Sequence, residues 1–178
     1  MPGLATHQLR VGGIVKLITD DRESILTALV HDMGNLAKFS NLDPYWSQEQ
    51  KKFWSKYGKD AHEATIKILE EAGLNKLRDN ILEESKFYNE VMEISDFATV
   101  RLPAVLTLYG DSRVAYNGVV SLEQRIVDLE TRYGKHRDDR LWASRLEDYV
   151  QTLTKIDIRA ITEVDVEPLF DELLQYPL

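Results

Sequence analysis

Apolar residues recur every three or four positions along most of the chain, which is the spacing of helices that bury one face. No strand alternation, internal repeat or interdomain linker interrupts this pattern. We therefore predict an all-α fold with a single domain over residues 1–178. The periodicity places the helices at 7–19, 20–33, 47–56, 60–72, 76–97, 103–117, 121–134, 138–154 and 164–175.

Polar residues and glycine mark the expected helix ends. Asp20 and Ser121 are each followed three positions later by a glutamate or glutamine, the pattern of a capping box. Asp60 opens another helix, and Gly73 follows that helix where a left-handed residue is typical. Pro103 suits a first-turn position, because its missing N–H has no helical partner there.

The predicted helix over 20–33 is apolar on nearly every side, as expected of a central buried helix, and Gly34 is expected to end it. It carries two adjacent polar residues, His31 and Asp32, whose burial is costly unless they are hydrogen-bonded, ion-paired or metal-bound. A single buried histidine is commonly a hydrogen-bonded core residue, so the pair alone leaves its purpose open. His7 and Asp111 lie on two other predicted helices, and only tertiary packing could bring them to the pair.

Composition narrows the chemistry. The chain has 30 acidic and 22 basic residues and a formal charge of −8, which disfavours bulk nucleic-acid binding but allows one small anionic ligand in a local pocket. It has no cysteine, so His, Asp and Glu would have to hold any metal. No run approaches the roughly 20 apolar residues of a membrane span. We expect a cytoplasmic protein without membrane contact and leave a homodimer open.

Several segments together resemble the HD-domain superfamily of metal-dependent phosphohydrolases, over residues 7–134. They read HQLRVGGIV, LTALVHDMGN, DAHEATIKILEEAGL and YGDSRVAYNGVVSLEQRIVDLETRYG. The family's order is a histidine, a His–Asp pair in a buried helix and a distal aspartate, which fall here on His7, His31, Asp32 and Asp111. The resemblance implies an HD-domain-like helical bundle in which these four bind a divalent metal ion, with further helices over 138–175.

The same resemblance implies the reaction. Metal-activated water would attack the phosphate ester of a nucleotide or a related small phosphorylated metabolite, with Mn, Co, Ni, Fe or Mg as the metal. Asp32 would both contact the metal and orient the water. Asp96 competes with Asp111 for the distal position, and the sequence that follows Asp111 favours Asp111.

The number of metals and the phosphate contacts are less defined by sequence. Family members with two metals have two further histidines before the distal aspartate, and this chain has only His62 there, so we expect one metal. His62 is a candidate to contact the phosphate or protonate the leaving group, or it only caps its helix. Asn35 stands where many relatives have lysine, and Lys38 or Arg10 could supply the missing positive charge. Arg10 could equally pair with a nearby acid.

Two alternatives remain at this stage. One is a regulatory or ligand-binding HD module that keeps the metal site without turnover. The other is a di-iron oxygenase of the same superfamily, against which the missing histidine argues. An aromatic cluster over 45–57 could stack on a nucleobase or simply pack.

Overall fold

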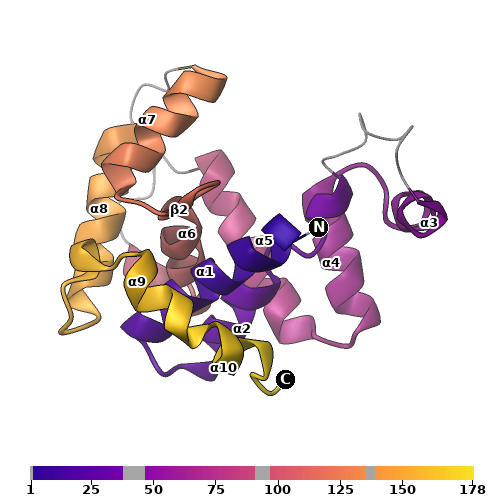
Figure 1. Ribbon diagram of the computed structural model, residues 1–178, viewed down its shortest axis with the longest axis horizontal. Coiled ribbons are helices and arrows are strands. Elements are labelled where there is room, and N and C mark those ends of the chain that lie inside the picture. The colour runs from indigo at the N-terminus through magenta and orange to yellow at the C-terminus, as the bar shows by residue number, and fades with distance from the viewer. Residues whose placement is uncertain (1, 38–46, 91–96, 135–138) are drawn as a thin grey trace.

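The computed structural model describes residues 2–37, 47–90, 97–134 and 139–178, and these form the predicted all-α fold (Figure 1). The α-helices are α1 (Pro2–Ile18), α2 (Arg22–Val30), α3 (Gln48–Tyr57), α4 (Ala61–Glu71), α5 (Asn75–Glu90), α6 (Leu102–Ser112), α7 (Leu122–Tyr133), α8 (Asp139–Thr152), α9 (Glu163–Val166) and α10 (Phe170–Leu174). Short 3-10 helices are η2 (Phe97–Thr99), η3 (Ile158–Ala160) and η4 (Glu167–Leu169). Strand β1 (Val114–Ala115) pairs antiparallel with β2 (Gly118–Val119).

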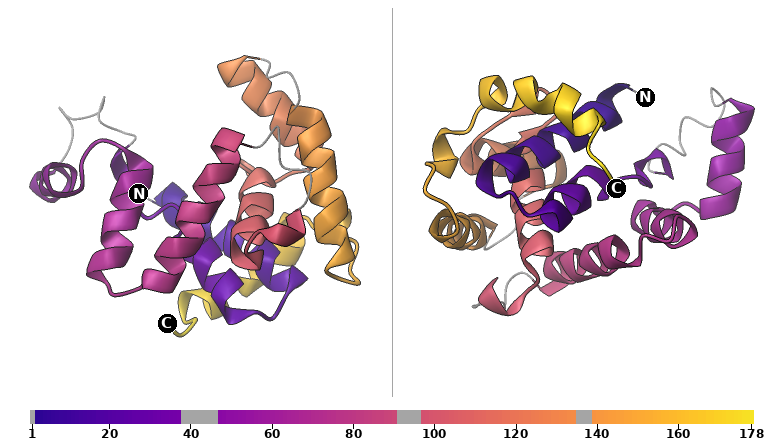
Figure 2. Two further views of the ribbon diagram at one scale, coloured as in Figure 1. Left: turned by 180° about the vertical axis from the view of Figure 1, so that it is seen from behind. Right: turned by 90° about the horizontal axis from the view of Figure 1, so that it is seen from below.

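Helices α1, α2 and α6 pack together at the centre and bury most of the apolar side chains. Val11, Ile14 and Val15 of α1 are fully buried between them. The C-terminal α9 and α10 lie along α1, while α4 and α5 pack beside α2 and carry α3 at the outer edge (Figures 1 and 2). Within the described ranges, no helix has the length and apolar character needed to cross a bilayer.

Local capping signals were read correctly at most helix ends. The side chain of Asp60 caps α4, Ser121 and Gln124 form the capping box of α7, and Pro103 lies in the first turn of α6. Gly73 has a φ of +71°, as expected for the residue after α4. The exception is α2, because its cap is Asp21, whose side chain accepts the Ser24 N–H at 2.9 Å, and not Asp20.

The helix predicted over 20–33 ends earlier than expected. α2 stops at Val30, so His31 and Asp32 lie in the turn that follows and not inside a buried helix. The turn is tight, since the Met33 N–H donates to the Val30 carbonyl at 3.2 Å. Gly34 fixes its position against α4: a Cβ on Gly34 would lie 2.1 Å from the Ala61 carbonyl oxygen. Only a glycine lets the turn approach α4 this closely.

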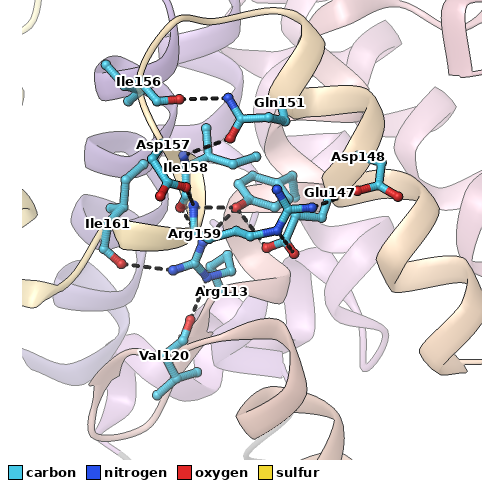
Figure 3. Close-up of polar contacts among 11 residues, drawn as sticks. Arg113, Val120, Glu147, Asp148, Gln151, Ile156, Asp157, Ile158, Arg159 and Ile161 are labelled. Atoms are coloured by element: carbon cyan, nitrogen blue, oxygen red, sulfur yellow. Dashed lines mark hydrogen bonds and ion pairs between the residues drawn. The ribbon is translucent and has the colours of Figure 1, made fainter.

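The helix predicted over 103–117 is also shorter, since α6 ends at Ser112 and a β-hairpin follows. The reversal is organised by Arg113, whose side chain is only 1% exposed. Its guanidinium donates to the backbone carbonyls of Val120, Ile158 at 2.7 Å and Ile161 at 2.8 Å (Figure 3). One buried cation therefore ties the end of α6 to the hairpin and to the segment after α8.

The predicted C-terminal helix over 164–175 is divided into α9, η4 and α10. Pro168 lies at the start of η4, where it cannot donate a backbone hydrogen bond. The division follows from this residue, and the three pieces still form one stretch along α1 (Figure 2).

Candidate metal centre

Four side chains from three separate segments meet at one point. His7 comes from α1, His31 and Asp32 from the turn after α2, and Asp111 from the last turn of α6. His7 Nε2 lies 3.1 Å from Asp111 Oδ1, 3.4 Å from Asp32 Oδ2 and 3.4 Å from His31 Nε2. His31 Nε2 lies 3.6 Å from Asp32 Oδ2 and 3.8 Å from Asp111 Oδ1.

These separations match those of ligands around one small cation. Two donor atoms each about 2.1 Å from an ion lie about 3.0 Å apart at a right angle and about 3.4 Å apart at a tetrahedral angle. Three of the five distances, at 3.1, 3.4 and 3.4 Å, lie within that range, and the other two, at 3.6 and 3.8 Å, exceed it slightly. Small side-chain movements would bring His7, His31 and Asp32 to one ion, with Asp111 Oδ1 beside the two histidines.

Close packing of α6 against α1 sets the distance between Asp111 and His7. Gly110 directly precedes Asp111, and Val11 lies one turn after His7. A Cβ on Gly110 would lie 3.0 Å from Val11 Cγ1 and 3.2 Å from the Val11 carbonyl oxygen. The absence of a side chain at residue 110 therefore lets the two helices approach.

His31 is oriented for its Nε2 atom to face the other three residues. The ring is 6% exposed, and its Nδ1 lies 2.8 Å from the Ala28 carbonyl, to which Nδ1–H donates. When the ring is neutral, this bond keeps the proton on Nδ1 and leaves the Nε2 lone pair facing the cluster. Asp32 is held in turn by Asn35, whose side-chain amide donates to Asp32 Oδ2. Asn35 thus has a role at the site that its sequence position did not suggest.

The two carboxylates of the cluster govern the pKa of the buried imidazole. Burial alone would lower the pKa of His31, but the carboxylates of Asp111 and Asp32, with a further contribution from Glu84 of α5, outweigh it and raise the pKa to about 10. Burial would raise the pKa of Asp111, yet His31 and His7 hold it well below its ordinary value. The C-terminal ends of α2 and α6 both lie here, and a helix C-terminus carries partial negative charge. A cation is therefore favoured at this point.

The cluster is open to solvent on one side. The side chains of His7 and Asp32 are each 22% exposed and that of Asp111 is 21% exposed, whereas His31 lies beneath them. Water and a small ligand can therefore reach three of the four residues.

The other predicted site residues do not belong to this cluster or lie outside the described residues. His62 lies in the first turn of α4, which packs on the turn at Gly34, but it is not in the group of potential metal ligands among the described residues. Arg10 forms an ion pair with Glu163 of α9. Lys38 and Asp96 lie outside the described residues, as do Tyr45 and Trp46 of the aromatic cluster.

The sequence did not point to two acidic residues that influence His31 or Arg10. Glu84 is buried on α5 and contributes to the raised pKa of His31, and Glu163 binds Arg10. Neither lies in a motif, and each reaches the site through tertiary packing, so no local signal could have identified them. No family model, curated protein or solved structure matches this chain.

Proposed function

We propose that the protein is a metal-dependent phosphohydrolase of the HD-domain type. Its substrate would be the phosphate ester of a nucleotide or a related small phosphorylated metabolite. The observation that carries this proposal is the convergence of His7, His31, Asp32 and Asp111 at distances close to those of ligands around one ion. The order of these residues along the chain, which resembles that of HD-domain phosphohydrolases, supports a phosphate ester as the substrate.

Two imidazoles and two carboxylates would hold Mn²⁺, Co²⁺, Ni²⁺, Fe²⁺ or Mg²⁺, since such ions accept nitrogen and oxygen donors. A bound divalent cation would lower the pKa of its water and offset charge on the phosphoryl oxygens. Asp32 is partly exposed and is fixed by Asn35, so its carboxylate can orient the attacking water and accept a proton. His62, in the adjacent first turn of α4, is our candidate to protonate the leaving oxygen.

We propose one metal ion per chain. Within the described ranges, His7, His31 and Asp32 form the group of three or more potential ligands, with Asp111 beside them, and no second such group is present. A di-iron centre would need further ligands next to the first four. This observation favours hydrolysis over the oxygenase alternative.

Metal content and activity test the proposal together. The purified protein should contain a divalent metal by elemental analysis, lose phosphatase activity toward a panel of phosphorylated metabolites when chelated, and regain it with one of the five ions. Asp111→Asn should weaken metal binding about 10- to 100-fold, the range seen when a metal's surroundings are disturbed, or more. Asp128→Asn is the control, because Asp128 forms ion pairs with Arg125 and Arg132 on α7.

The outcomes separate the candidate functions. Activity that persists after exhaustive chelation would overturn the metal-dependent mechanism. Tight metal binding without hydrolysis of any phosphorylated compound would instead favour a binding or regulatory module.

A further inference from the structure

Arg10, three residues after His7 on α1, forms a bidentate ion pair with Glu163 of α9. Arg10 Nε lies 2.7 Å from Glu163 Oε1 and 3.0 Å from Oε2, and Arg10 Nη2 lies 2.7 Å from Oε1. Glu163 Oε2 also accepts the backbone N–H of Val119 at 2.9 Å. Figure 1 shows the segments involved, with α9 beside α1 and β2. The carboxylate therefore has a fixed position, and it fixes the guanidinium.

Only one edge of the guanidinium is used. An arginine presents two edges that can each bind an oxyanion through two N–H groups, one with Nε and Nη2 and the other with Nη1 and Nη2. Glu163 occupies the first edge. In the part of the chain that the structure describes, no residue hydrogen-bonds to Arg10 Nη1. The side chain as a whole is 17% exposed.

Arg10 lies on the same side of α1 as His7 of the cluster. Arg10 follows His7 by three residues, and residues three apart on a helix are neighbours with their Cβ atoms about 5–6 Å apart. Both side chains are about one-fifth exposed. An anion that reaches His7 from solvent therefore meets a fixed guanidinium next to it.

We infer that Arg10 binds the phosphoryl group of the substrate through its Nη1 and Nη2 edge, and that Glu163 is the residue that positions it. This inference rests on the proposed phosphohydrolase function. It would supply a positive charge at the site, where Asn35 stands at the position of a lysine in many of the HD-domain phosphohydrolases that the sequence resembles. It also makes the C-terminal segment part of the substrate site, although Glu163 is 153 residues from Arg10 in the sequence.

A purely structural ion pair is the competing explanation, and the chain contains a matched example. Lys16 pairs with Glu172 at 2.9 Å and joins the same two segments, α1 and the C-terminal helices. Lys16 lies nine residues beyond His7, so it is remote from the cluster. If the Arg10–Glu163 pair only holds the C-terminal segment against α1, then loss of this pair and loss of the Lys16–Glu172 pair should affect phosphate binding equally.

Binding of inorganic phosphate to the full-length, Mn²⁺-loaded protein tests the inference without turnover. Calorimetry would compare the wild type with Arg10→Lys, Glu163→Gln and Glu172→Gln. Arg10→Lys keeps the positive charge but removes the planar guanidinium, which can bind an oxyanion along each of two edges. Glu163→Gln keeps the shape but replaces one of the two acceptor oxygens by an NH2 group, which can only donate, so the guanidinium loses one side of its fixed contact.

We expect Arg10→Lys to weaken phosphate binding about 10- to 100-fold, the equivalent of one or two charge-assisted hydrogen bonds. Glu163→Gln should weaken it at least about threefold, a smaller loss because the positive charge remains. Glu172→Gln should leave it unchanged. All four proteins should bind Mn²⁺ with similar affinity, because none of the variants alters a proposed ligand.

The possible contrary results distinguish failure of the proposed function from failure of the Arg10 inference. A wild-type protein that binds none of Mn²⁺, Co²⁺, Ni²⁺, Fe²⁺ and Mg²⁺ overturns the proposed function, and if another of these ions binds in place of Mn²⁺, the same comparison is made with that ion. If Mn²⁺ binds but Arg10→Lys retains full phosphate affinity, or the wild type binds no phosphate, the inference fails and the metal site stands. If Glu163→Gln tightens phosphate binding, Glu163 competes with the anion and does not position Arg10. Equal losses in Glu163→Gln and Glu172→Gln would identify both pairs as structural.

Discussion

Metal binding by this protein should displace a proton from His31, and its affinity should rise with pH. The nearby carboxylates raise the pKa of His31 to about 10, so the ring is protonated at neutral pH in the metal-free protein. Its Nδ1 donates to Ala28, and the second proton lies on Nε2, the atom that faces the proposed metal position. A metal ion can bind Nε2 only after this proton leaves.

The size of the effect follows from that pKa. At pH 7, three units below it, about one ring in 1,000 is neutral, and this fraction rises about tenfold for each pH unit. The apparent affinity for Mn²⁺ or Co²⁺ should therefore increase about 100-fold from pH 6 to pH 8 through His31 alone. Asp111 adds no dependence in this range, since His31 and His7 hold its pKa well below its ordinary value.

Competition with a coloured chelator at several pH values measures the affinity, and calorimetry in buffers of different ionisation enthalpy counts the protons released. His62→Ala is a suitable control and should keep the same pH dependence, because His62 is not among the proposed ligands. An affinity that is equal at pH 6 and pH 8, with no proton released, would refute the assignment of His31 Nε2 as a ligand.

The interaction of His31 with Asp111 should make the metal-free protein less stable at high pH. A raised folded-state pKa means that the stabilisation from His31 is complete below its ordinary pKa of about 6.5 and is lost as the pH rises toward 10. For Asp111 the folded-state pKa is lowered, so its contribution is present above the ordinary value of about 3.9 and is lost as the pH falls. Urea unfolding with a chelator present should give a free energy lower at pH 9 than at pH 5 by up to about 3 kcal/mol. Equal values would contradict this pairing.

Three substitutions test other parts of the structure. His62→Ala should retain the bound metal while lowering turnover of a phosphate ester, and loss of the metal would show that His62 is itself a ligand. Gly110→Ala should force α6 away from α1, cost about 1–3 kcal/mol and weaken metal binding, whereas Gly3→Ala, with open space around it, should do neither. Arg113→Met should cost about 3 kcal/mol or more in urea unfolding, because it leaves buried carbonyls without donors, while Arg159→Met, which breaks exposed ion pairs, should cost less than about 1 kcal/mol. Equal losses for the two arginine variants would refute the structural role of Arg113.

Helix positions and most caps could be predicted from the sequence because they depend on neighbouring residues. Asp60 and Ser121 show this, since each cap is completed within three residues. The β-hairpin could not be predicted in this way. Its strands are two residues long, and it is held by bonds from Arg113 to Val120 and from Val119 to Glu163, a partner 44 residues away.

The four clustered residues were grouped by a resemblance and not by spacing. Nothing local to His7 or Asp111 indicates that they meet, because their contact depends on the approach of α6 to α1 at Gly110. Gly12 allows a similar close approach between α1 and α2. Glycine disfavours a helix in sequence, yet a Cβ on Gly12 would lie 2.6 Å from Leu29 Cδ2 of α2. Glycines that look like defects in an isolated helix are thus the positions where helices come closest.

Charge distinguishes this cluster from an ordinary core network. A structural network pairs its charges, as Arg113 does with carbonyl oxygens and the Tyr109 hydroxyl. Here Asp32 and Asp111 lie against two imidazoles, beside two helix C-termini, so a protonated His31 alone does not balance the two carboxylates. Replacing such groups by apolar residues commonly costs nothing or stabilises a fold. Their presence at a point exposed to solvent therefore supports the proposed cation, which would offset the charge of the carboxylates.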